Sequence, residues 1–363
     1  MVHGPGQYAM ERKQLNTQSP AAGKKTGIPP RGARPLLFLV WVICLLTLAQ
    51  LLAPGVLAAN SIQVKVSPLR LDPTSPNRRT FGMLLFMNGF ELASRDSRFG
   101  GLSGLALSDD GQTLYAVSDR GYWFSAILTK DAEGRLVGMG PWTVASLVDT
   151  DGKVIRSRER DAEALTRDRN GSFIVAFERS PRLWRYPASP APFGRPPQSL
   201  PLPPEIFHAP NNAGLEATTV LLDGRLLLLT ENFQNPDGTV KGWIFENNRY
   251  APVSYISKDE FLPTDLATLP DGDLLLVERQ YRVLRGAVVR LRRIPGPDLK
   301  AGARLRGKEI LLLAPPLEVD NFEGVAVGRD TTKGTFVYLV SDDNYSPLQR
   351  TLLLQFRLIE AVP

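Results

Sequence analysis

Acidic residues recur in pairs at equal distances from Asx-Gly turns in this sequence. Each pair brackets two apolar runs joined by such a turn, which is the strongest short-range signal of a β-hairpin. The pairs and their turns are Glu163 and Glu178 around Asn170-Gly171, Glu216 and Glu231 around Asp223-Gly224, and Asp265 and Glu278 around Asp271-Gly272. A two-residue loop would place both acids of each pair directly opposite each other. Because like charges in such positions are destabilising, the pattern predicts a positive partner for these carboxylates.

Two further hairpins extend this acidic set. The N-terminal one has Ser103 in place of the first acid and ends at Asp119, whereas the C-terminal one carries Glu323 and Asp342. Carboxylate and amide oxygens suit a hard cation such as Ca2+. The candidate ligands of the predicted calcium site are Glu163, Glu178, Glu216, Glu231, Asp265, Glu278, Glu323, Asp342 and Asp119. Neighbouring amide oxygens could come from Asn212, Asn232, Asn321 and Asn344.

Two other arrangements would also offset the acidic charges. Arg120, Arg179 and Arg279 each directly follow an acid. Alternation along a strand points them to the opposite face of that strand, but they could still reach an acid of a neighbouring repeat. The acids could instead accept hydrogen bonds from the backbone of adjacent repeats, so metal binding and a structural role both remain open. The candidate substrate-binding residues are Arg120, Arg179, Arg279, Asn212, Asn232 and His208.

The spacing of these hairpins predicts the fold. The repeats begin at residues 103, 163, 216, 265 and 323, which gives a period of about 50 to 60 residues built of strands. This predicts an all-β protein, a β-propeller of antiparallel blades. The direct count is five blades, and a sixth would need a degenerate repeat within 122–160 or 187–210. We expect a strand over 81–92 to close the ring beside residues 352–358.

Propeller geometry gathers the acids at one place. The first strand of each blade lines the central channel, and each repeat has its first acid at the start of that strand. The second acid ends the following strand, and these two ends of an antiparallel hairpin lie together. We therefore expect an acidic ring near the axis, at one face of the propeller.

Signals of other catalytic classes are weak. His208 is the only histidine after residue 58, and no cysteine nucleophile or G-x-S-x-G motif occurs there. A lone histidine in a loop of Pro and Asn is typical of a surface or packing residue. If the protein hydrolyses an ester, a metal-bound water is the simplest nucleophile. Basic residues near the rim would then hold an anionic substrate.

The first 58 residues form a different kind of segment. A polar, basic stretch over 1–34 precedes the apolar run Leu36–Leu57, and small residues follow at Ala58-Ala59. This pattern predicts an export signal cleaved after Ala58, although an uncleaved membrane anchor is the alternative because the run approaches a membrane span. We expect a periplasmic or extracellular protein that consists of this leader, an N-terminal extension over 59–79 and a propeller domain over 80–360.

The charge of the chain changes once this leader is removed. The whole chain has 43 basic and 37 acidic residues, and the part after residue 58 retains 37 and 36. Near-neutrality argues against a nucleic-acid partner or membrane-surface binding. The only cysteine, Cys44, lies in the leader, so the exported domain would have no disulfide. We expect a monomer that contacts a membrane only through an uncleaved leader.

Several motifs occur in a specific order along the chain. They are Gly100–Leu105 with Ser118–Gly121, Glu163–Leu165 with Phe177–Arg179, Asn212–Glu216 with Thr230–Asn232, Leu269–Gly272 with Glu278-Arg279, and Asp320–Gly324 with Ser341–Asn344. From about residue 80 to 358 this order resembles the phytase-like domain family, also called "esterase-like activity of phytase". The resemblance implies an exported bacterial propeller that hydrolyses esters. Calcium-dependent propeller phytases bind Ca2+ at an acidic channel mouth and hydrolyse phosphomonoesters, which is consistent with the acidic ring.

Our leading hypothesis is an exported, Ca2+-dependent hydrolase of phosphate or carboxylic esters. A non-catalytic propeller that binds a small ligand or a partner at the same face is the first alternative. A lactonase-like propeller with a central metal is the second alternative. These hypotheses differ in whether the acidic ring holds a cation and whether an ester is turned over.

Overall fold

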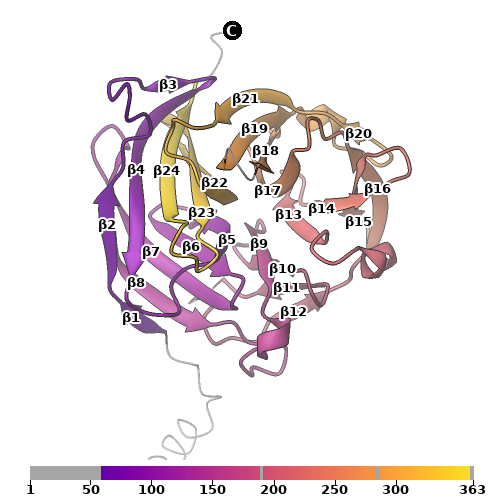
Figure 1. Ribbon diagram of the computed structural model, residues 1–363. Helices are drawn as coiled ribbons and strands as arrows, with labels where there is room; N and C mark the ends of the chain where they lie inside the picture. The colour runs from indigo at the N-terminus through magenta and orange to yellow at the C-terminus, as the bar shows by residue number, and fades with distance from the viewer. Residues whose placement is uncertain (1–58, 189–190, 283–285, 360–363) are drawn as a thin grey trace, which may run out of the picture. The chain divides into compact units, whose positions relative to one another are not determined.

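The computed structural model describes residues 59–188, 191–282 and 286–359, which form a five-bladed β-propeller (Figure 1). The predicted export signal lies outside these residues. Apart from strands, the described chain contains the short 3-10 helices η1 (Ser157–Glu159), η2 (Pro204–His208) and η3 (Gly296–Asp298). None of its helices is long and apolar enough to cross a membrane.

The blades are antiparallel sheets that follow one another around the axis. From the axis outward, blade one contains β5 (Leu102–Leu107), β6 (Thr113–Ser118), β7 (Tyr122–Lys130), β8 (Leu136–Ser146) and β1 (Asn60–Ile62). Blade two contains β9 (Ala162–Arg167), β10 (Phe173–Phe177), β11 (Arg182–Tyr186) and β12 (Gln198–Leu200). Blade three contains β13 (Leu215–Val220), β14 (Leu226–Gln234), β15 (Val240–Glu246), β16 (Arg249–Tyr255) and the parallel strand β20 (Arg304–Leu305).

The last two blades follow the same plan. Blade four contains β17 (Leu262–Thr268), β18 (Leu274–Arg282), β19 (Gly286–Ile294) and β21 (Lys308–Leu313). Blade five contains β22 (Asn321–Asp330), β23 (Gly334–Asp342), β24 (Thr351–Leu358), β4 (Leu84–Ser94) and β2 (Val64–Pro68), and β3 (Thr80–Phe81) also pairs with β4. The five-blade count is confirmed. The two regions considered for a sixth blade instead supply outer strands to blades one and two.

The ring closes between the N-terminal and C-terminal parts of the propeller. Strand β4 pairs with β24, with Leu92 opposite Thr351 and Leu84 opposite Leu358, so the predicted closing strand is confirmed. The first part of the segment 59–79 also lies in the sheets, because β1 pairs with β8 and β2 pairs with β4. The consecutive strands β1 and β2 thus belong to blades one and five, and they connect the first blade to the last (Figure 1).

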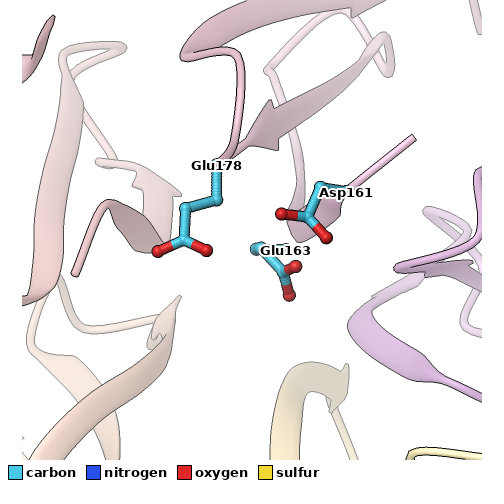
Figure 2. Close-up of side chains that lie close together, drawn as sticks. All are labelled: Asp161, Glu163 and Glu178. Atoms are coloured by element: carbon cyan, nitrogen blue, oxygen red, sulfur yellow. The ribbon is translucent and has the colours of Figure 1, made fainter. Parts of the chain in front are cut away.

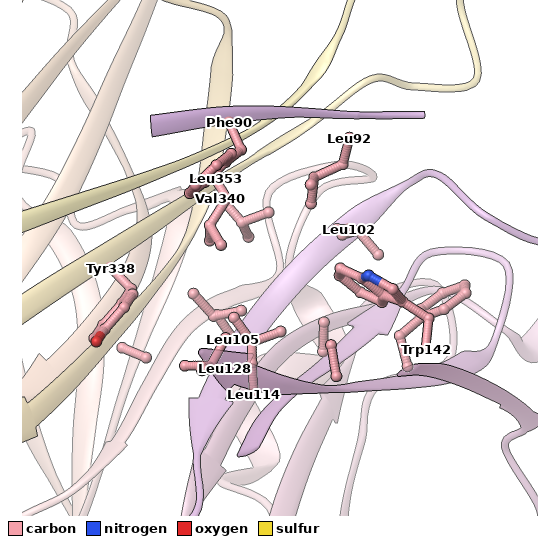
Figure 3. Close-up of a cluster of buried hydrophobic side chains, with 14 of the residues drawn as sticks. Phe90, Leu92, Leu102, Leu105, Leu114, Leu128, Trp142, Tyr338, Val340 and Leu353 are labelled. Carbon is pink, nitrogen blue, oxygen red and sulfur yellow. The ribbon is translucent and has the colours of Figure 1, made fainter. Parts of the chain in front are cut away.

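The hydrophobic core lies between the faces of adjacent blades. All six residues of β5 and all five of β10 are buried, because both faces of these strands are covered. Such strands appear in the sequence as continuous apolar runs. Figure 3 shows the packing between blade five and blade one, where Phe90, Leu353 and Tyr338 face Leu105 and Trp142.

The register of the hairpins differs from the prediction by one residue. Thr166 pairs with Ile174 and Thr218 pairs with Leu228, so each loop contains three residues. Gly171 has a φ of 78° whereas Asn170 has no positive φ. This is a type I turn followed by a left-handed glycine, because a two-residue type I′ turn would need positive φ at both positions. The prediction that two acids lie directly opposite each other is therefore wrong.

Candidate functional site

A β-bulge interrupts every inner strand near its first residues. Each bulge leaves one residue of the inner strand without a partner on the second strand. These residues are Ser103, Glu163, Glu216, Thr264 and Glu323. Bulges re-aim side chains, and here they occupy the same place in all five blades.

A second set of equivalent positions lies on the second strands, each one residue after the partner of the residue that precedes the bulge. Its members are Asp119, Glu178, Glu231, Arg279 and Asp342. We call these five residues and the five bulge residues the axial ring. Seven of the ten are acids, so the structure brings together seven of the nine predicted metal ligands.

Blade four departs from the predicted assignment. There the bulge residue is Thr264 and the end residue is Arg279, so Asp265 and Glu278 each lie one position away from the axial ring. The cause is their place in the repeat, because Asp265 and Glu278 each lie one residue closer to Gly272 than Glu163 and Glu178 lie to Gly171, while the loop length is the same. Arg279 therefore takes the place that an acid takes in the other blades.

The two displaced acids have structural partners. Asp265 is fully buried and accepts hydrogen bonds from the backbone N–H of Val325 at 2.7 Å and of Leu266 at 2.8 Å. Glu278, also fully buried, accepts from the Tyr255 hydroxyl at 2.6 Å and from Arg290 Nε at 2.7 Å. Asp265 thus links blade four to the backbone of blade five.

Arg279 supplies the positive charge that the acidic pattern predicted. Its guanidinium contacts Glu323 Oε1 at 2.5 Å on one neighbouring blade and Glu231 Oε1 at 3.1 Å on the other. It also donates to the amide oxygen of Asn321. Burial disfavours the charged form of Arg279. The negative charges of Glu323 and Glu231 outweigh this effect, so the pKa of Arg279 is raised. The expectation that an arginine reaches acids of neighbouring repeats is confirmed.

One arginine does not neutralise the whole axial ring. Burial, followed by the charge of Glu323, raises the pKa of Asp342 to about 9. Burial raises the pKa of Asp119 to about 6. The pKa values of Glu163 and Glu216 lie well above the usual range, because burial and nearby acids disfavour their ionised forms. The mouth of the channel thus favours the binding of positive charge.

Three carboxylates come closest to one another on blade two. One oxygen from each of Asp161, Glu163 and Glu178 lies within 4.8 Å of the others. Figure 2 shows these three side chains close together. The other contacts of Glu178 fix its position: Oε1 accepts from the Gly214 N–H at 2.9 Å. A Cβ on Gly214 would lie 2.7 Å from the Glu178 Cγ, so only glycine allows this close approach.

These carboxylates fit a hard cation such as Ca2+. Such a cation takes oxygen ligands at 2.3–2.6 Å, so two of its ligands lie no more than about 5 Å apart. Asp119 Oδ1 lies in the same region and is buried without a hydrogen-bond partner among the described residues. Sequence analysis missed Asp161, because it precedes the apolar run of β9 and has no counterpart in the other repeats.

An arginine-rich pocket adjoins this carboxylate group. The pocket has a volume of about 360 Å³ and includes the carboxylates of Asp119 and Asp161. Its remaining lining residues are Arg120, Arg158, Arg160, Arg179 and Ser157. Arg158 and Arg160 come from the segment around η1, and no sequence motif predicted that this segment lies near the axis.

Several contacts hold this pocket in shape. The Arg120 guanidinium stacks over the ring of Tyr345 at 3.2 Å from its centroid. Arg160 Nε donates to the carbonyl of Ile155 at 3.0 Å. Arg179 Nε lies 3.1 Å from Asp161 Oδ2. The pocket therefore combines fixed and exposed guanidinium groups, which bind anionic oxygens well.

The other predicted substrate-binding residues do not line the arginine-rich pocket. Asn212 lines a second pocket together with Glu178 and Arg179. Asn232 is exposed and accepts a hydrogen bond from Gln234 Nε2 at 2.7 Å. His208 is exposed at the end of η2, as expected for a surface histidine.

The fold and this site together define a five-bladed β-propeller with an acidic cluster at one mouth of its channel. The chain belongs to the Phytase-like family, described as "Esterase-like activity of phytase", which matches residues 97–345. The resemblance drawn from the sequence motifs is confirmed. No curated protein sequence matches the chain.

Solved structures are similar over most of the chain at low identity. Aldose sugar dehydrogenase from Streptomyces coelicolor in its PQQ-bound form is 13% identical, with coverage of 83% of this chain and 100% of that chain and a TM-score of 0.39. A gluconolactonase from Xanthomonas campestris is 12% identical, with coverages of 82% and 98% and a TM-score of 0.37. A protein of unknown function from Dyadobacter fermentans is 11% identical, with coverages of 77% and 99% and a TM-score of 0.40. These similarities are too distant to bear on activity.

Proposed function

We propose that this protein is an exported, Ca2+-dependent hydrolase of anionic esters that acts at the axial ring. The observation that carries the proposal is the contact between an oxygen-rich group and an arginine-rich pocket. Asp161 belongs to both, and Arg179 pairs with it at 3.1 Å. An ester with a phosphate or carboxylate group would thus have its charge held beside a cation site.

Each group of residues has a separate role in this proposal. Asp161, Glu163 and Glu178 would hold Ca2+, which supplies Lewis-acid activation of water and of the ester oxygen when bound. Arg120, Arg158, Arg160 and Arg179 would bind and orient the anionic group.

Hydrolysis adds water across the ester bond. The water oxygen bonds to phosphorus or to the acyl carbon, the bond to the alcohol oxygen breaks, and the alcohol leaves with a proton. Glu216 has a pKa well above its usual range because of burial and the adjacent Glu231. Its carboxyl group, whose protonated form this environment favours, would donate that proton, and the proton that the attacking water loses would restore it.

A non-catalytic ligand-binding propeller is the second candidate. It is favoured by the ion pairs of Arg279 with Glu231 and Glu323, which already neutralise part of the axial ring without a metal. In this case the arginine pocket would bind an anion without turning it over.

Calcium titration and hydrolysis assays separate these candidates. We expect Ca2+ to bind wild-type protein and Glu163→Gln to weaken the binding by about tenfold or more, since a ligand charge is lost. Hydrolysis of 4-nitrophenyl phosphate or of monoethyl succinate, which both carry an anionic group, should require Ca2+ and stop with chelator. The matched control is Glu133→Gln, an exposed acid on blade one, which should leave both properties unchanged.

The possible outcomes differ clearly. Ca2+ binding without turnover of either ester would favour the ligand-binding candidate. If Ca2+ affinity is the same in wild type and Glu163→Gln, the three carboxylates are not the cation site.

A further inference from the structure

A second pocket adjoins the same carboxylate group. It has a volume of about 480 Å³, and its residues are Glu178, Arg179, Pro181, Ile206, Phe207, Ala209, Pro210, Asn211, Asn212 and Gly214. Half of them are apolar side chains, in contrast to the arginine pocket. The two pockets share Arg179, whereas Asp161 lines one and Glu178 lines the other. The carboxylate group therefore borders both an arginine-rich subsite and a partly apolar one.

The local fold keeps an aromatic ring exposed in this pocket. Helix η2 buries Ile206 completely against the core between blades two and three. The next residue, Phe207, points away and is 63% exposed. Exposed phenylalanine side chains lose the free energy that burial would give, about 2 kcal/mol for a full side chain. Such a ring in a pocket next to a reactive site offers a surface for an apolar group.

Backbone hydrogen bonds connect the wall of this pocket to Glu178. The loop after η2 returns to β13 through Gly214, whose N–H binds Glu178 Oε1 at 2.9 Å. Ala209 N–H in turn donates to the carbonyl of Ile206 at 3.0 Å, which closes the helix. The wall that carries Phe207 thus has a fixed position relative to Glu178.

We propose that this second pocket binds the apolar leaving group of an anionic ester. The proposal rests on the function proposed above and extends it to the substrate class. The phosphate or carboxylate would lie on the arginines, the bond to be broken over the carboxylate group, and an alkyl or aryl alcohol against Phe207 and its apolar neighbours. A substrate of this class is amphipathic, unlike a highly charged polyphosphate.

Binding of alkylphosphonates tests this subsite without turnover. Methyl-, butyl- and octylphosphonate carry the same anionic group and cannot be hydrolysed at the C–P bond. With Ca2+ present, we expect the Kd measured by calorimetry to fall by about twofold per methylene, which is half the effect of complete burial. Phe207→Ser should remove most of this dependence on chain length, and Phe207→Leu should retain part of it.

A matched variant controls for the loss of any exposed apolar residue. Leu312 is 46% exposed on β21 of blade four, and Leu312→Ser should leave the chain-length dependence unchanged. Monoalkyl phosphates of the same lengths have leaving groups of similar pKa. In the wild type their kcat/KM should therefore rise with chain length because longer chains bind more tightly.

The results distinguish the two proposals. If methylphosphonate binds and longer chains bind no better, the apolar subsite is wrong while the anionic site stands. The subsite is also wrong if Phe207→Ser and Leu312→Ser change the dependence equally. If no phosphonate binds and no ester is hydrolysed, the proposed function fails together with the subsite.

Discussion

Arg279 has an unusual position among the residues of the axial ring. Equivalent positions in the other blades hold Asp119, Glu178, Glu231 and Asp342, so one blade supplies a cation where four supply acids. Its side chain is only 22% exposed and pairs with acids on both neighbouring blades. A buried ion pair is weak evidence for stability in itself, but removal of one partner leaves uncompensated charge.

We predict that Arg279→Gln strongly destabilises the protein in the presence of chelator. Loss of the guanidinium leaves Glu231 and Glu323 unpaired, which should lower the free energy of unfolding by about 3 kcal/mol. The measurement is urea denaturation with and without Ca2+, and added Ca2+ should restore part of the loss. As a control, Arg179→Gln should change the unfolding free energy by less than about 1 kcal/mol, because Arg179 is 68% exposed. Equal losses in both variants would contradict the assigned role of Arg279.

At the scale of elements, the repeated β-bulge has two uses. In blades two, three and five it carries Glu163, Glu216 and Glu323 into the axial ring. In the other two blades it carries a hydroxyl that binds the next blade. Ser103 donates to the carbonyl of Ala162, and Thr264 donates to the carbonyl of Phe322 at 3.3 Å. The side chain of the bulge residue therefore decides the role of the bulge. An acid contributes to the axial ring, whereas a hydroxyl connects adjacent blades.

We predict that Thr264→Val lowers the free energy of unfolding by about 1 to 2 kcal/mol, because a buried carbonyl of the next blade loses its hydroxyl donor. Valine has nearly the same shape as threonine, so the loss of stability measures the contribution of the hydrogen bond. Denaturant unfolding with unchanged m-value is the measurement. Thr331→Val on an exposed turn should have little effect, and a similar cost there would argue against the joint between blades four and five.

At the scale of the molecule, closure of the ring forces acids from four blades into one region. No single blade contains this concentration of charge. The raised pKa values of Asp119, Glu163, Glu216 and Asp342 are consequences of that closure and of burial. The folded state thus holds protons that the unfolded chain would release.

We predict that stability in chelator falls as pH rises from about 4 to about 9. A carboxyl with a raised pKa stabilises the folded state below its unfolded pKa, and this contribution is lost as pH rises through the folded pKa. For Asp119, a change from 3.8 to about 6 corresponds to a loss on the order of 3 kcal/mol by neutral pH. Thermal unfolding at several pH values measures it.

Two variants of this experiment test its cause. Asp119→Asn should make the fall with pH shallower, because its titration is removed. Ca2+ should also reduce the fall, since it binds the folded state and offsets the acidic charge. Stability that instead rises with pH over this range would show that the acids are not held in their protonated form.

The local pattern of the sequence determined the propeller, its five hairpins and the gathering of acids at one face. Alternation, Asx-Gly turns and a regular period are local signals, and ring closure follows from them. The tertiary structure decided which acids reach the axis. In blades two, three and four the β-bulges select the residues eight before and seven after each turn glycine, so Thr264 and Arg279 lie in the axial ring and Asp265 and Glu278 do not. The arrival of Asp161, Arg158 and Arg160 at the same site depends on contacts between loops and neighbouring blades, which no local pattern encodes.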